Sequence, residues 1–140
     1  MFRTRTLFAA GFAALSVLLS GCDIFGGGHT GTYVLKTVNG KPLPAVILEI
    51  IGTYKAEITA GSVTLNEDDT FSASITFRET EGSTVRTQTE TDSGTYTISG
   101  NTITFTSPGT GPAFTGTLSG GTLTVTTEED DITLVLVFEK

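Results

Sequence analysis

The chain has 140 residues, a length typical of one domain, and its 8 basic and 15 acidic residues give a formal charge of −7. Nucleic acids and anionic lipid surfaces repel a protein this acidic, so we expect neither as a partner. The chain holds 1 cysteine, which excludes an intrachain disulfide.

The start of the chain differs in character from the rest. Residues 1–6 carry two positive charges and no negative one, and residues 7–19 form the apolar stretch LFAAGFAALSVLL. A charged start, an apolar stretch and then small residues are typical of a secretory signal. The apolar stretch is shorter than the roughly 20 helical residues that cross a bilayer. The sequence therefore predicts a cleaved signal over residues 1–21 and no permanent membrane span.

The signal ends in Leu19-Ser20-Gly21-Cys22, which resembles the lipobox of bacterial lipoproteins. In that family the cysteine receives diacylglycerol on its sulfur, becomes the first residue of the mature protein and is acylated on its amine. Each buried methylene contributes roughly 0.8 kcal/mol, so several acyl chains make a stable anchor. The resemblance implies that lipid on Cys22 attaches the protein to a membrane of the cell envelope. A simple secretory signal with a chance cysteine is the alternative.

The predicted mature chain begins with a short tether. Removing Arg3 and Arg5 changes the formal charge from −7 to −9. Residues 22–30 are rich in glycine, which predicts a flexible tether that keeps the domain close to the membrane. In enteric bacteria an aspartate directly after the lipidated cysteine retains a lipoprotein in the inner membrane. Asp23 has that place here, which favours the periplasmic side of the inner membrane and leaves the outer membrane open.

Residues 31–140 are predicted to form one all-β domain. Apolar and polar side chains alternate, threonine is abundant and no window keeps a helical period. The clearest strand places Phe71, Ile75 and Phe77 on one face. The predicted strands are 31–38, 46–51, 54–59, 62–65, 70–78 and 85–91, two hairpins over 94–106 and 116–126, and a last strand over 132–138.

This order of strands predicts an antiparallel up-and-down meander. Closure into a barrel of about 8–10 strands would remove the exposed edges that a long meander leaves. A β-sandwich of two packed sheets is the alternative. The stretch 85–91 alternates but is polar, so we expect it to be an edge or solvated strand.

Several short motifs resemble the lipocalin-like domains of bacterial lipoproteins. The resemblance covers residues 31–138 and implies a lipocalin-like barrel that can bind a small apolar ligand. In that family a tryptophan in the first strand plugs one end of the barrel, and Tyr33 takes its place here. The motifs are Gly31-Thr32-Tyr33, Asn39-Gly40 with Leu43-Pro44, Leu65-Asn66 with Asp69-Thr70-Phe71, and Ser93-Gly94-Thr95-Tyr96.

A ligand would contact the inward-facing apolar side chains of such a barrel. The same side chains would serve equally well as a solid core. The alternative function is therefore a non-enzymatic structural or interaction module of the envelope, for example one that is inhibitor-like, in which a surface or the strand 85–91 docks an unknown protein partner. The predicted pocket lining is Tyr33, Leu35, Phe71, Ile75, Phe77, Tyr96, Ile98, Ile103, Phe105, Leu134 and Leu136.

The sequence offers no set of catalytic or metal-ligating residues. His29 is the single histidine and lies in the predicted tether, where we expect it to be solvated. The sequence therefore lacks the ligands of a usual zinc site and a histidine held in place for a Ser-His-Asp triad. The acidic runs 67–69 and 128–131 do not match a calcium loop. Glu90 and Asp92 share a strand face, where solvated acids are the commoner case. We expect no enzyme, no metal and no cofactor.

Overall fold

The computed structural model describes residues 27–109, 113–129 and 131–140. The predicted signal, the lipobox and Cys22 lie outside these ranges. No helix within them is long and apolar enough to cross a membrane. A 3-10 turn, η1 (Gly27–His29), precedes the strands of the described residues. These are β1 (Gly31–Val38), β2 (Lys41–Pro42), β3 (Ala45–Ile50), β4 (Tyr54–Leu65), β5 (Thr70–Glu81), β6 (Thr84–Ser99), β7 (Thr102–Thr106), β8 (Phe114–Ser119), β9 (Thr122–Glu129) and β10 (Ile132–Glu139).

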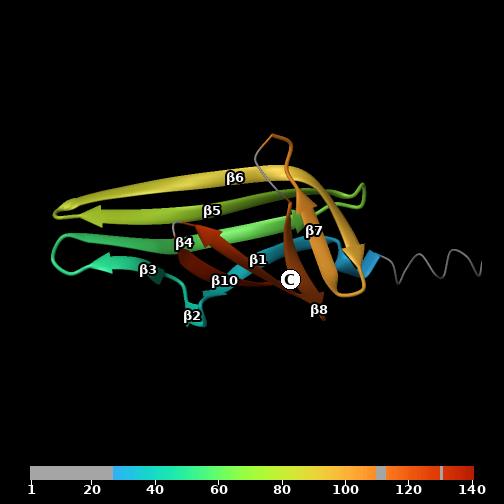
Figure 1. Ribbon diagram of the computed structural model, residues 1–140, viewed down its shortest axis with the longest axis horizontal. Helices are drawn as coiled ribbons and strands as arrows, with labels where there is room; N and C mark the ends of the chain where they lie inside the picture. Colours follow the sequence, from blue (N-terminus) through green and yellow to red (C-terminus); the bar gives the residue numbers. More distant parts are fainter. Residues whose placement is uncertain (1–26, 110–112, 130) are drawn as a thin grey trace, which may run out of the picture.

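Eight strands of the described residues close into an antiparallel barrel. From β4 to β10 each strand pairs with the next one along the chain, and β1 closes the ring by pairing with both β10 and β4. Figure 1 shows β1 and β10 side by side in this ring. The predicted up-and-down barrel is confirmed, and the alternative of a two-sheet sandwich is wrong.

Part of the sheet continues past the ring. β3 pairs with residues 54–58 of β4, whereas β1 pairs only with residues 62–65. On the other side, β7 pairs only with residues 95–99 of β6, so residues 84–94 have β5 as their single neighbour. In Figure 1 this part projects away from the barrel. We call it the sheet extension; it comprises β3 and the adjoining portions of β4, β5 and β6.

Two predicted breaks in the chain are wrong. The segments 54–59 and 62–65 form the single strand β4, with one irregularity of register between Ile58 and Ala60. The segment 85–91 is likewise continuous with the first strand of the predicted hairpin 94–106, and together they form β6. β5 pairs along the whole of β4 and along residues 84–95 of β6, so a long ladder of hydrogen bonds overrides the local turn signals.

Alternation along the strands sends every second side chain into the barrel. Phe71 on β5, Phe105 on β7 and Phe138 on β10 are buried in this way. Every buried side-chain nitrogen or oxygen of the described residues has a hydrogen-bond partner. The buried apolar residues are Tyr33, Leu35, Val38, Ala45, Ala56, Ile58, Val63, Leu65, Phe71, Tyr96, Ile103, Phe105, Leu123, Val125, Leu134, Leu136 and Phe138.

One end of the barrel is closed by two tyrosines. The hydroxyl of Tyr33 donates to the carbonyl of His29 at 2.6 Å, and that of Tyr96 donates to the carbonyl of Asn66 at 2.7 Å. Burial raises the pKa of both phenols, so both stay protonated and keep donating. Tyr33 is 1% exposed and fills the position where the resemblance implied a plug.

The end of the predicted tether packs against this closed end. The His29 ring meets the Tyr96 ring edge-on at 5.9 Å, and the side chain is half-buried rather than solvated as expected. The Lys140 ammonium donates to the carbonyl of Gly28 at 2.9 Å. The end of the predicted tether is therefore part of the fold, because Gly28 and His29 complete the hydrogen bonding of the closed end.

A buried carboxylate on the outer face of the extension links β4 to β5. The Glu57 side chain accepts from Arg78 Nε at 2.9 Å and from Arg78 Nη2 at 2.8 Å, and Lys55 Nζ lies 3.3 Å from its other oxygen. The hydrogen bonds from Arg78 hold the pKa of Glu57 below its usual value although burial opposes this. The ion pair stays charged at neutral pH and fixes the register of these two strands.

Candidate functional site

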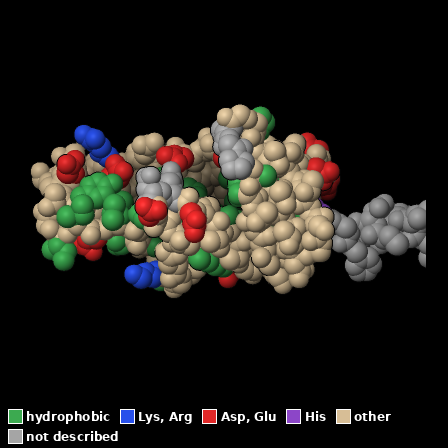
Figure 2. All heavy atoms as spheres, viewed as in Figure 1, with side chains coloured by type: hydrophobic (Ala, Val, Ile, Leu, Met, Phe, Trp, Pro, Cys, Tyr) green, Lys and Arg blue, Asp and Glu red, His purple; other side chains and the backbone are tan. Residues whose placement is uncertain are grey.

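A cavity of about 900 Å³ opens at the other end of the barrel, between the sheet extension and β9–β10. Apolar side chains from both sides form most of its wall. Figure 2 shows apolar, acidic and a few basic side chains over the extension and the middle of the face in view, whereas acidic side chains at the barrel end lie at its far edge. The lining is Ile47, Leu48, Tyr54, Ala56, Ile58, Ser62, Val63, Phe71, Ala73, Ser74, Ile75, Phe77, Glu79, Gln88, Glu90, Thr91, Asp92, Phe105, Phe114, Val125, Thr127, Glu128, Ile132, Leu134, Leu136 and Phe138.

Three aromatic rings form the floor of the cavity. The Phe105 ring meets Phe71 edge-on at 4.9 Å and stacks on Phe114 at 4.8 Å. Toward the closed end, Tyr96 and Ile103 are buried without contact with the cavity. The barrel is therefore filled by side chains in the half near the closed end, and it is hollow in the half near the end where the cavity opens.

The residues that the sequence predicted as pocket lining fall into three groups. Ile98 lies near the β6–β7 turn and is 36% exposed. Tyr33, Leu35, Tyr96 and Ile103 are buried in the filled half and do not line the cavity. The structure brings together around the cavity Phe71, Ile75, Phe77, Phe105, Leu134 and Leu136.

Several lining residues were not predicted from the sequence. Leu48 and Ala56 reach the cavity because β3 and β4 pair along the extension, with these two residues directly opposite one another. Phe114 was missed because the predicted strand began at residue 116. Strand alternation was the available signal for all three, but only the pairing of the strands shows which alternating face meets the cavity.

The polar part of the lining comes mainly from β6. Asp92 Oδ2 accepts from the Ser107 hydroxyl at 2.6 Å, and Asp92 Oδ1 accepts from the Ser93 amide at 2.8 Å. On β5, Glu79 accepts from the Tyr54 hydroxyl at 3.0 Å. These bonds hold two carboxylates in place at the edge of the cavity.

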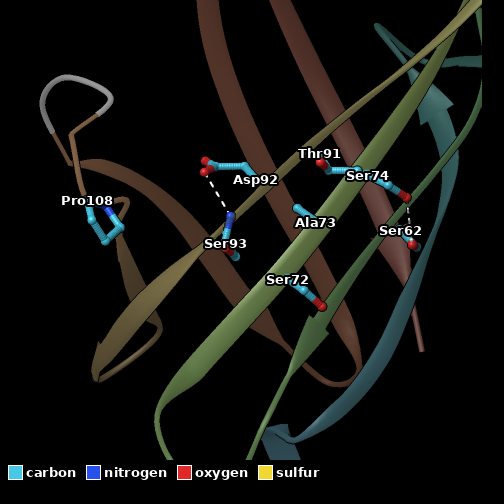
Figure 3. Close-up of a pocket in the computed structure, with 8 residues that line it drawn as sticks. All are labelled: Ser62, Ser72, Ala73, Ser74, Thr91, Asp92, Ser93 and Pro108. Atoms are coloured by element: carbon cyan, nitrogen blue, oxygen red, sulfur yellow. Dashed lines mark hydrogen bonds between the residues drawn. The ribbon is translucent and has the colours of Figure 1, made fainter.

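A shallower recess adjoins the cavity where β6 leaves the barrel. Its volume is about 710 Å³, and serine and threonine side chains make up much of its border. Figure 3 shows Ser62 and Ser74 joined by a hydrogen bond of 3.3 Å, with Asp92 and Pro108 on the opposite side of the view. The described lining of the recess includes Ala73 and Pro108 but no aromatic or branched aliphatic side chain, so we take the larger cavity as the candidate binding site.

The described residues place no metal-ligand cluster and no histidine at the cavity. Within the described ranges, no three His, Cys, Asp or Glu side chains are grouped closely enough to hold a metal ion. His29 lies at the closed end, at the other end of the barrel from the cavity, and cannot act there as a general base. The cavity offers an apolar surface with carboxylate and hydroxyl groups at its edge.

The sequence was compared with protein families, curated proteins and solved structures. Residues 30–136 match the family model of the lipocalin-like domain. No curated protein and no solved structure matches the sequence significantly. The family match spans most of the chain and agrees with the closed eight-stranded barrel of the described residues. The chain therefore belongs to the family of lipocalin-like domains.

Proposed function

We propose that this protein is a lipid-anchored, non-enzymatic binding protein of the bacterial cell envelope, and that its barrel holds one small apolar ligand. The cavity at the open end carries this proposal. Its volume of about 900 Å³ lies in the range of roughly 300–1,000 Å³ that is usual for small-molecule sites.

The composition of the cavity wall supports an apolar ligand. Phe77 and Ile75 on β5, Leu48 on β3 and Leu134 on β10 line the cavity, and Leu48 is 42% exposed. Exposed apolar surface in a concave site is stabilised when a ligand covers it. Membership of the lipocalin-like family agrees with such a role.

A substitution that fills the cavity tests this proposal. Ala73 lines the cavity, so Ala73→Phe should place a ring in the ligand volume and weaken binding of the apolar fluorophore N-phenyl-1-naphthylamine by about tenfold or more. Fluorescence titration of the unlipidated mature chain, which carries Cys22→Ala, measures the affinity. The parent protein should bind the probe saturably with about one site per chain.

The matched control is the same substitution one residue earlier. Ser72 is exposed and borders the shallower recess but not the larger cavity, so Ser72→Phe adds the same ring outside the cavity lining. It should leave the affinity for the probe unchanged. Equal losses in the two variants, or no saturable binding by the parent protein, would refute a ligand site in the cavity.

Attachment to the membrane is the second part of the proposal, and the lipobox supports it. The segment before β1 packs against the closed end of the barrel. An anchor on Cys22 would therefore hold the closed end nearer to the bilayer and leave the cavity facing away from it. Asp23 favours the periplasmic side of the inner membrane.

Substitution of the cysteine tests the anchor. In a bacterial host supplied with an alkyne-tagged fatty acid, the parent chain should incorporate the tag and sediment with membranes, and Cys22→Ala should do neither. A host mutant in which lipoprotein processing is blocked provides the control. A parent chain that stays untagged would refute lipidation and leave the cavity proposal intact.

One observation supports the alternative of an interaction module. The predicted edge strand 85–91 does lie at a free edge, since residues 84–94 of β6 pair with β5 alone. An extended segment of a partner protein could add to such an edge. Crosslinking from residue 89 in intact membranes would test this, and recovery of no reproducible partner would count against it.

A further inference from the structure

Two cavity-lining positions on the part of β6 that runs past the ring carry carboxylates. The register of β5 and β6 places Asp92 opposite Ala73 and Glu90 opposite Ile75, on the face that Phe71 shares. A strand face that borders an apolar cavity ordinarily carries apolar side chains. On β5 the residues at these paired positions are apolar, whereas those of β6 are acidic. The wall formed by β6 is therefore charged.

The charge at the edge of the cavity has a single sign. Glu79, Glu90, Asp92 and Glu128 are all part of the lining, and no described lysine or arginine belongs to it. Arg78 is engaged by Glu57 on the outer face of the extension. Arg86 lies directly opposite Glu79 in the ladder of β5 and β6 but is not part of the lining. Within the described residues, no lining side chain neutralises these carboxylates.

The acidic wall faces an apolar one. Phe77 and Ile58 lie on the β4–β5 side, and Ile132 and Leu134 lie on the β9–β10 side. Asp92 is already fixed by Ser107 and Ser93, yet a carboxylate has about four acceptor positions, so capacity remains for a ligand. The cavity thus presents an apolar surface for a tail beside fixed negative charge for a head group.

We propose that the cavity selects amphiphiles with a positively charged head group, such as long-chain amines, over neutral and anionic molecules with the same tail. This inference rests on the proposed function and specifies its ligand class. The tail covers the apolar walls, and the ammonium group lies at Glu90 and Asp92. A carboxylate or phosphate head group at the same place meets like charge and is excluded.

Three ten-carbon probes that differ only in the head group test the selection. Decylamine, 1-decanol and decanoate should displace N-phenyl-1-naphthylamine from the unlipidated mature chain in that order of affinity at neutral pH. We expect decylamine to bind about tenfold or more tightly than 1-decanol, and the preference to shrink as salt is added. Equal binding of decylamine and 1-decanol would overturn the selection and leave the apolar site standing. Failure of all three probes would overturn both proposals.

Variants that replace one carboxylate by an amide show which residues cause the preference for decylamine. Glu90→Gln and Asp92→Asn should each reduce the preference for decylamine several-fold without changing the affinity for 1-decanol. Glu90 is exposed, so Glu90→Gln keeps the fold even if Asp92→Asn disturbs the contact with Ser107. Glu67 lies in the exposed turn between β4 and β5, outside the cavity lining, and Glu67→Gln removes the same unit of charge. An equal loss of preference in Glu67→Gln would show that net charge is responsible and would overturn the assignment to the cavity.

Discussion

Replacement of Phe105 by alanine is expected to lower the free energy of unfolding by about 3–5 kcal/mol. The side chain is 1% exposed and contacts the rings of both Phe71 and Phe114. Truncation removes its buried apolar surface and both aromatic contacts, and it leaves a void that the closed barrel cannot collapse to fill. The floor of the cavity is thus also the centre of the stabilising core.

Urea denaturation followed by circular dichroism measures this effect, and the lack of tryptophan in the chain makes fluorescence a weaker probe. Ile98→Ala on the neighbouring strand is the control, because Ile98 is 36% exposed and should cost less than about 1 kcal/mol. If Phe105→Ala were as mild as Ile98→Ala, the aromatic cluster would not be the centre of the core.

Substitution of Gly94 by alanine is expected to destabilise the protein by at least about 2 kcal/mol, even though only one methyl group is added. A Cβ atom at this position would lie 2.0 Å from the carbonyl oxygen of Thr106 and 2.9 Å from its carbonyl carbon. Gly94 is where β6 passes from pairing with β5 alone to pairing with β7 as well. The close approach of the backbones at this junction requires a residue without a side chain.

The same denaturation assay measures the cost at Gly94. Gly28→Ala is the control, because a Cβ atom there would meet nothing within 4 Å. Its free energy of unfolding should stay within about 0.5 kcal/mol of the parent value. A Gly94→Ala variant as stable as the parent protein would mean that β6 and β7 separate at this point without cost.

Alternation in the sequence was sufficient to predict the class of fold and most of the strands. β1 and β7 were predicted within their actual bounds, and the core faces of β5 and β10 follow directly from Phe71 to Phe77 and from Ile132 to Phe138. Such faces are readable because a strand buried on one side must place its apolar residues at every second position.

The extent of the strands could not be predicted in the same way. Ala60-Gly61 and Ser93-Gly94 are local signals for a turn, yet β4 and β6 run straight through them. Their continuity depends on pairing with β5, in which Gly61 pairs with Ile75 and Gly94 pairs with Phe71. These separations are longer than a local turn pattern spans. The sheet extension, and with it one side of the cavity, is a product of that pairing.

The position of the cavity could not be predicted from the sequence either. Inward-facing residues such as Ile103 and Phe105 differ by two positions on one strand, but only Phe105 reaches the cavity. The difference comes from depth along the barrel, which depends on strand stagger and not on residue type. Glu90 and Asp92 were identified in the sequence as sharing a face, and the register of β6 with β5 shows that this face is the inner one.

The hydrogen bond between Lys140 and Gly28 places the described beginning of the fold and the C-terminus of the chain at the closed end. A fluorophore or surface tag attached after Lys140 would therefore be remote from the cavity. The proximity of the two ends also suits circular permutation: a short linker could join them, and new ends could be cut in the exposed β5–β6 turn at Gly82 and Ser83. Such a rearranged chain would carry its ends at the tip of the extension and could report by its own fluorescent label when the cavity is filled.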